Sequence, residues 1–184
     1  MKNKITAFFA LLLCACTVLC SCGADISALE NLCFAVESFD LAKAEKYVSD
    51  AEGYFEDVRA LESELTEEQR QIAKEVYSYT GFSGFSEKDG VCTVTVKYVD
   101  VAELMRNANG GLAAGVGTAS EYIRDAIDSG ALKNLFVKTE QNVKVVLSQE
   151  NGKAKVPLGY TGENADFTRL LGLETFLRWY SLQR

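Results

Sequence analysis

The chain has 184 residues and a net charge of −7, with 26 acidic residues against 19 basic ones and no histidine. The absence of histidine excludes Ser-His-Asp and Cys-His catalysis and removes the most common zinc ligand, so we expect neither a metal nor another cofactor. An acidic chain without basic clusters is not expected to bind nucleic acid or anionic lipid headgroups through charge.

Residues 1–21 have the pattern of a signal peptide. Lys2 and Lys4 form a basic start, and an uncharged apolar run follows from Ile5 to Leu19. Because that run is shorter than the roughly 20 residues that a membrane-spanning helix needs, a cleaved signal is favoured over a transmembrane anchor.

The sequence LCSCG at residues 19–23 resembles the lipobox of bacterial lipoproteins, in which a small residue precedes the cysteine to be acylated. The resemblance implies cleavage between Ser21 and Cys22 and a diacylglycerol on Cys22. Such a protein lies at the cell membrane, anchored on its extracytoplasmic face, and two acyl chains would make the anchoring stable. Residues 22–25 would then form the lipid anchor and a short tether.

Cys33 and Cys92 are the only thiols that remain after this processing, because the other four of the six cysteines lie within residues 1–22. Export permits a disulfide between Cys33 and Cys92, since extracytoplasmic compartments are oxidising. The alternative, which we favour, is two separate buried thiols that pack as small hydrophobic residues.

The first third of the remaining chain has helical periodicity. Asp40 is placed to cap a short helix, and Thr66 opens a capping box with Gln69. Apolar residues at helical spacing predict four successive helices, over residues 26–39, 41–48, 54–65 and 66–79.

Period-two alternation then predicts a strand over residues 91–100, paired with a strand that contains Phe82 and Phe85. A helix that begins at Asp100 is expected to break at residues 109–111. A further helix is expected from the capping box at Thr118 to about Gly130. The Gly/Ala segment 110–117 lacks the Lys-Ser/Thr ending of a phosphate-binding loop and is interpreted as a flexible connection or a lid.

The last third predicts a hairpin followed by a closing helix. Residues 143–147 and 154–158 alternate on either side of Asn151-Gly152, which favours a type I′ turn. Pro157 indicates that the second arm is an edge strand or is about to end. Asp166 then opens one helix through Tyr180.

Carboxylates are the remaining candidates for acid or base chemistry. Asp100 and Asp40 are the best placed, with Tyr98 as an assisting hydroxyl. Both carboxylates also fit the N-cap position of the helix that follows them, and we favour capping because a catalytic carboxylate requires an apolar pocket.

This order of elements is similar to that of the nuclear transport factor 2-like superfamily, and in particular to uncharacterised lipoproteins of Gram-positive bacteria with such a domain. Besides the lipobox, the similarity lies in residues 34–44, 94–100 and 151–153. It implies a single α+β domain over residues 26–184. N-terminal helices would pack on a curved antiparallel sheet, forming a cystatin-like cone, and a C-terminal helix would follow.

Members of that superfamily include isomerases, dehydratases and binding modules, so the fold alone selects no function. Because no catalytic constellation is recognisable, we expect a non-enzymatic, membrane-anchored domain that binds an envelope protein, a peptide or a small ligand. The alternative is an isomerase- or dehydratase-like enzyme that uses a buried carboxylate in the cone pocket.

Overall fold

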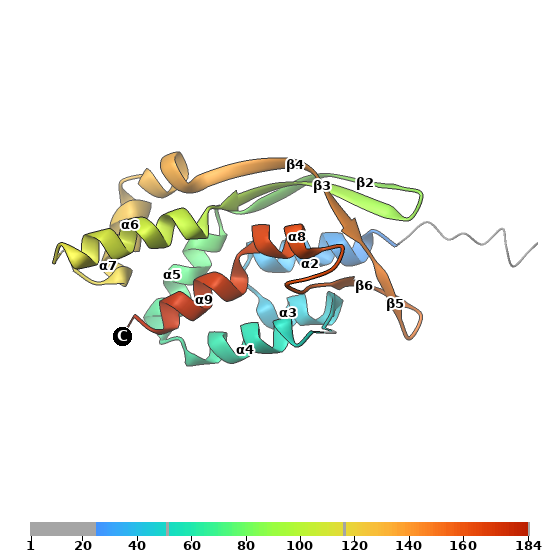
Figure 1. Cartoon of the computed structure of the whole chain (residues 1–184), viewed down its shortest axis with the longest axis horizontal. Helices are drawn as coiled ribbons and strands as arrows, with labels where there is room; N and C mark the ends of the chain where they lie inside the picture. Colours follow the sequence, from blue (N-terminus) through green and yellow to red (C-terminus); the bar gives the residue numbers. More distant parts are fainter. Residues whose placement is uncertain (1–24, 51, 116, 184) are drawn as a thin grey trace, which may run out of the picture.

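The computed structural model describes residues 25–50, 52–115 and 117–183 and has a mixed α+β architecture (Figure 1). Within those ranges, no helix is long and apolar enough to cross a membrane. The helical elements are α2 (Ser27–Glu37), α3 (Leu41–Ala44), η1 (Glu45–Tyr47), α4 (Tyr54–Glu64), α5 (Glu67–Tyr77), α6 (Val101–Ala113), α7 (Ala119–Asp128), η2 (Leu132–Phe136), α8 (Ala165–Leu171) and α9 (Leu173–Ser181). The strands are β1 (Val48–Ser49), β2 (Gly81–Lys88), β3 (Val91–Val99), β4 (Val137–Val146), β5 (Ser148–Glu150) and β6 (Lys153–Pro157).

The strands form two three-stranded sheets that do not close into a barrel. One sheet has the antiparallel order β2-β3-β4, and the other has the order β1-β6-β5, in which β1 runs parallel to β6. Strand β4 leads into β5 through Leu147, so one bent segment joins the two sheets (Figure 1). Register shifts between Ser83 and Ser86 and between Val94 and Val96 add curvature to the first sheet, as β-bulges do.

Helices α2 and α8 pack beneath the β2-β3-β4 sheet, and α4 lies along α9 further from it (Figure 1). The predicted alternation of β3 is confirmed, because Cys92, Val94 and Val96 are fully buried. Between the helices, the ring of Tyr77 stacks on Phe39 at a centroid distance of 5.2 Å and meets Phe176 at 5.9 Å. The core is therefore continuous from the sheet to the outer helices.

The structure confirms the predicted helix caps and the predicted turn, which each depend on only a few neighbouring residues. Thr66 and Thr118 each form the predicted capping box with the residue three positions on. Asn151 and Gly152 have φ angles of 52° and 74°, as a type I′ turn requires. Of the two alternatives for the arm with Pro157, the end of a strand is confirmed, because β6 ends there, and an edge strand is wrong, because β6 lies between β1 and β5.

The predicted helix break at residues 109–111 is wrong, because α6 continues through both glycines to Ala113. A glycine inside a helix costs only about 1 kcal/mol relative to alanine. Tertiary contacts oppose that cost here, since the Trp179 indole N–H donates to the Asn109 side chain at 3.0 Å. Residues 110–113 are therefore helical, so the interpretation as a flexible connection or a lid is wrong for this half of the segment 110–117.

Two further boundaries differ from the prediction. Hairpin pairing is limited to β5 and β6, because Val143 and Val145 pair with β3 instead. The closing helix is two helices, α8 and α9, which Gly172 separates in the left-handed conformation with a φ angle of 62°. A side chain at Gly172 would also approach Val101 to 3.0 Å, so both backbone and packing favour glycine there.

The buried side chain of Asn164 joins the ends of the two sheets. Its Oδ1 accepts the N–H of Val146 at 2.8 Å, and its Nδ2 donates to the carbonyl of Val146 at 2.8 Å. The same Nδ2 donates to the carbonyl of Pro157 at 2.9 Å. The Asn164 side chain thus bonds to both backbone groups of Val146, the last residue of β4, as a neighbouring strand would. It also holds Pro157, the last residue of β6, close to Val146.

Replacing Asn164 with alanine should lower the free energy of unfolding by about 3 kcal/mol, because three hydrogen bonds are lost and buried backbone groups remain unpaired. Urea denaturation of the wild type and Asn164→Ala measures this loss. The matched control is Asn107→Ala, since Asn107 is exposed and makes one hydrogen bond to the carbonyl of Glu103. Equal losses in the two variants would contradict the role given to Asn164.

Candidate functional site

Asp40 and Asp100 are helix caps. The Asp40 carboxylate accepts the N–H of Lys43 at 2.9 Å, and the Asp100 carboxylate accepts the N–H of Glu103 at 3.0 Å. Asp40 is exposed and Asp100 is half-buried. The capping interpretation of both residues is confirmed, and both carboxylates are used to hold the first turn of a helix.

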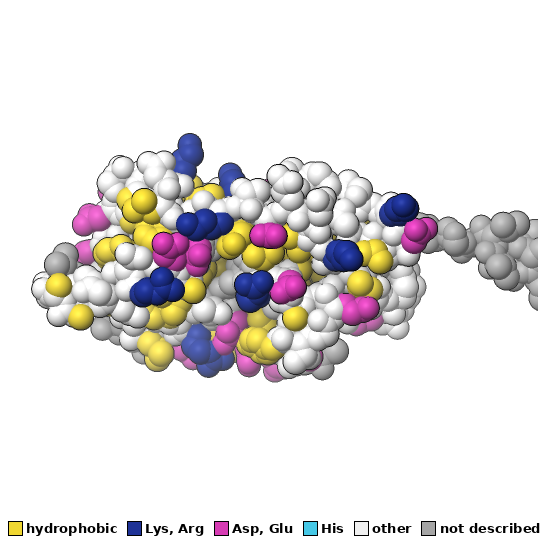
Figure 2. All heavy atoms as spheres, turned by 45° about the horizontal axis from the view of Figure 1, so that its top comes forward, with side chains coloured by type: hydrophobic (Ala, Val, Ile, Leu, Met, Phe, Trp, Pro, Cys, Tyr) yellow, Lys and Arg dark blue, Asp and Glu magenta, His cyan; other side chains and the backbone are white. Residues whose placement is uncertain are grey.

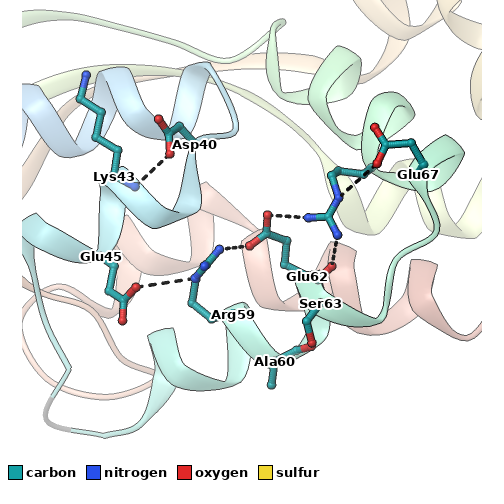
Figure 3. Close-up of polar contacts among 9 residues, drawn as sticks. Asp40, Lys43, Glu45, Arg59, Ala60, Glu62, Ser63 and Glu67 are labelled. Carbon is teal, nitrogen blue, oxygen red and sulfur yellow. Dashed lines mark hydrogen bonds and ion pairs between the residues drawn. The ribbon is translucent and has the colours of Figure 1, made fainter.

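Figure 3 shows Asp40 beside an ion-pair network centred on Glu62. The nearly buried Glu62 carboxylate binds Arg59 and, at 2.8 Å, Arg70, and Arg59 also lies 3.6 Å from Glu45. Arg59 and Glu62 are on α4, whereas Arg70 is on α5. The network therefore joins two helices, and its buried carboxylate is fully paired.

Tyr98 is half-buried and precedes Asp100 by two residues at the end of β3. It lines an open hollow of about 460 Å³ together with Glu140, Arg169 and Leu170. Neither Asp40 nor Asp100 lines that hollow. The hollow at Tyr98 therefore lacks both carboxylates that were considered for proton transfer.

Cys33 and Cys92 are fully buried and unpaired. Burial raises the pKa of the Cys33 thiol, helped by the negative charge of Glu37, and burial likewise raises the pKa of the Cys92 thiol. Both groups therefore stay as protonated thiols, which are poor nucleophiles. Ser21 and Cys22 lie outside the described residues. Within the described ranges, no group of three or more Cys, Asp or Glu residues is arranged to hold a metal.

A cavity of about 370 Å³ lies between α4, the loop that follows β6, and the break between α8 and α9. Buried Tyr54 forms one wall, and Tyr160, whose side chain is 54% exposed, stands at the mouth. Their rings meet edge to face, with centroids 5.2 Å apart and an interplanar angle of 76°. The volume falls within the range of small-molecule pockets.

One carboxylate contributes to the wall of this cavity. Glu174 is only 9% exposed, and its side chain pairs with Arg178. Its negative charge helps to raise the pKa of Tyr160. Arg178 also lies 4.0 Å from Asp57. The cavity therefore combines aromatic surface with a buried, charge-balanced acid, which suits recognition of a ligand that has both apolar and polar parts.

Glu52 fixes the loop that carries Tyr160. Its carboxylate accepts the N–H of Tyr160 at 2.9 Å and the hydroxyl of Thr161. The Thr168 hydroxyl accepts the N–H of Gly159 at 3.2 Å, and a side chain at position 159 would collide with Glu52. Together with Asn164 at the end of the loop, these contacts hold the mouth of the cavity in place.

The two tyrosines of the cavity are held in their neutral form. Burial raises the pKa of Tyr54, against a smaller lowering by the backbone N–H of Glu174. Partial burial and then the charges of Glu174 and Asp57 raise the pKa of Tyr160. Both hydroxyls are therefore hydrogen-bonding groups rather than charges near neutral pH.

Sequence reasoning did not single out this cavity. Tyr54 begins the helix expected over residues 54–65, and no role was predicted for Tyr160 or Glu174. The three residues come from α4, the loop after β6 and α9, so no short-range spacing relates them.

Comparisons with protein-family models, curated proteins and solved structures find no match for this chain. The resemblance to nuclear transport factor 2-like lipoproteins therefore stays a prediction from the sequence.

Raising the pH above about 10 should lower the free energy of unfolding, because tyrosines of the unfolded chain then ionise while Tyr54 stays neutral in the folded one. The variant Tyr54→Phe should reduce that slope by up to about 1.4 kcal/mol per pH unit. Burial also raises the pKa of Tyr77, so part of the pH dependence should remain in the variant. Urea denaturation between pH 9 and about pH 11 measures the slopes, and identical slopes would contradict the burial of the Tyr54 hydroxyl.

Proposed function

We propose that this chain is a membrane-anchored lipoprotein on the extracytoplasmic face of the cell membrane, and that its domain binds a ligand without catalysing a reaction. The lipobox at residues 19–23 supports the anchor. The observation that carries the binding function is the cavity with the Tyr54 and Tyr160 rings on its wall and the buried Glu174 carboxylate beside them.

The shape of this cavity favours a small molecule, or one side chain of a peptide or envelope protein. Its volume of about 370 Å³ is too small for a folded segment. Tyr160 offers an exposed aromatic surface at the mouth, and aromatic side chains dominate the free energy of many binding sites. Polar selection would come from Glu174 and Arg169, which both line the cavity.

A nuclear transport factor 2-like cone is part of this proposal. The supporting features are N-terminal helices beneath a bulged antiparallel sheet and a second sheet reached through the bend at Leu147. The cavity lies beside α8 and α9, outside the sheet itself, so the proposed ligand site belongs to the C-terminal helices rather than to the inside of a cone.

An isomerase- or dehydratase-like enzyme is the less favoured proposal. Proton transfer would require Asp40 or Asp100 to face a substrate in an apolar pocket. Each instead accepts a backbone N–H from the helix that it caps. Binding requires no such free carboxylate.

Replacing Cys22 with alanine should abolish lipidation and signal cleavage. Mass spectrometry of the full chain, expressed in a Gram-positive host, should find a diacylglycerol on residue 22 of the wild type and an unlipidated, uncleaved chain for Cys22→Ala. Cys20→Ala is the matched control, because it removes a neighbouring thiol and leaves the acceptor cysteine. A lipidated Cys22→Ala protein would contradict the proposed anchor.

The variant Tyr160→Ala should weaken ligand binding about tenfold or more, because it removes the aromatic surface at the mouth of the cavity. Amino acids, dipeptides and cell-wall sugars can be screened for a rise in Tm, and the affinity of any ligand found can then be measured by calorimetry. Leu135→Ala is the control, since Leu135 is 58% exposed and does not line the cavity. Unchanged affinity in Tyr160→Ala, or no ligand in the screen, would contradict the proposed site.

A further inference from the structure

Three lysines from separate segments line one open cleft of about 710 Å³. Lys46 lies in η1, and Lys153 and Lys155 lie on β6. Asp25 and Ser27, where the described chain begins, line the same cleft. The β5-β6 hairpin and the start of α2 accordingly lie at the same end of the molecule (Figure 1).

The three ammonium groups concentrate positive charge in this cleft. Lys155 donates to the backbone carbonyl of Lys46, which places these two lysines side by side. Lys153 and Lys155 are two positions apart on a strand and therefore share a face. Among the described residues, none of the three lysines forms an ion pair. Among the residues that the structure describes, Asp25 is the only acidic one that lines the cleft.

The sequence shows no run of basic residues that would predict this grouping of lysines. Lys46 and the two lysines of β6 are more than a hundred positions apart, but the packing of α2 and η1 against β6 brings them together. On the face shown in Figure 2, by contrast, basic and acidic side chains are interspersed. The cleft thus differs in charge from an otherwise acidic chain.

We propose that Lys46, Lys153 and Lys155, here called the lysine face, contact anionic phospholipid headgroups of the membrane that holds the lipid on Cys22. This inference rests on the proposed lipid anchor. Asp25 follows Cys22 by three positions, and three extended residues span at most about 11 Å. Because Asp25 lines the same cleft as the lysines, the tether keeps the lysine face within reach of the headgroups.

The uneven distribution of charge would orient the domain on the membrane. Lysines near an anionic bilayer surface are attracted within about one Debye length, whereas the acidic remainder of the chain is repelled. A lipid anchor alone leaves the domain free to rotate about its tether. The lysine face would select the orientation that places the β5-β6 hairpin on the bilayer.

The test uses the processed, lipidated full chain in vesicles of phosphatidylcholine, with or without phosphatidylglycerol. A fluorophore on Gln149→Cys reports the position of the hairpin, because Gln149 is exposed and lines the cleft while both native thiols are buried. Quenching by a nitroxide on the lipid headgroup should be stronger in the anionic vesicles, and it should weaken at high salt.

Neutralising the lysine face should weaken that quenching. The combined variant Lys46→Gln, Lys153→Gln and Lys155→Gln should lower the ratio of docked to undocked protein about fivefold per lysine. Lys153→Gln alone, at an exposed position, shows the effect without affecting the bond between Lys155 and Lys46. The control combines Lys74→Gln, Lys133→Gln and Lys144→Gln, which are exposed lysines that do not line the cleft.

Flotation with the phosphatidylcholine vesicles separates the two claims. Absence of flotation would contradict the lipid anchor and, with it, the inference. Flotation with equal quenching in neutral and anionic vesicles would overturn the lysine face and leave the anchor intact. Equal losses in the lysine-face and control variants would overturn it as well.

Discussion

The structure depends on one buried polar contact, in which Asn164 satisfies both backbone groups of Val146 and the carbonyl of Pro157. These residues end β4 and β6, strands of different sheets. Because a buried polar group without a partner costs roughly 1–3 kcal/mol, the amide fixes the points at which the chain leaves both sheets. The loop after β6 and the start of α8 are placed from there.

Both proposed binding surfaces depend on the positions that Asn164 fixes. The loop between Pro157 and Asn164 is fixed at both ends, and Glu52 holds its middle, so Tyr160 stands against Tyr54 at the mouth of the cavity. Strand β6 begins with the lysines that line the cleft beside Asp25. The same framework thus presents a cavity for a ligand and a lysine face for the membrane. Because the rest of the chain is acidic, the lysine face differs from it in charge.

Sequence reasoning succeeded where a signal is complete within a few residues. The caps at Asp40 and Thr66 and the turn at Asn151 are of this kind. It failed where distant contacts decide, as when α6 continues through two glycines against Trp179. The cavity and the lysine face share that property, because the residues of each come from separated segments and no alternation or spacing relates them. The α+β class was predictable, whereas the position of the site was not.

Amide hydrogen exchange at Val146 tests the central claim most directly, because its N–H has the side chain of Asn164 as its hydrogen-bond partner. We predict that this amide is protected as strongly as those of the buried strand β3 in the wild type, and that Asn164→Ala removes the protection. Rapid exchange at Val146 in the wild type, at the rate of an exposed loop, would contradict the account.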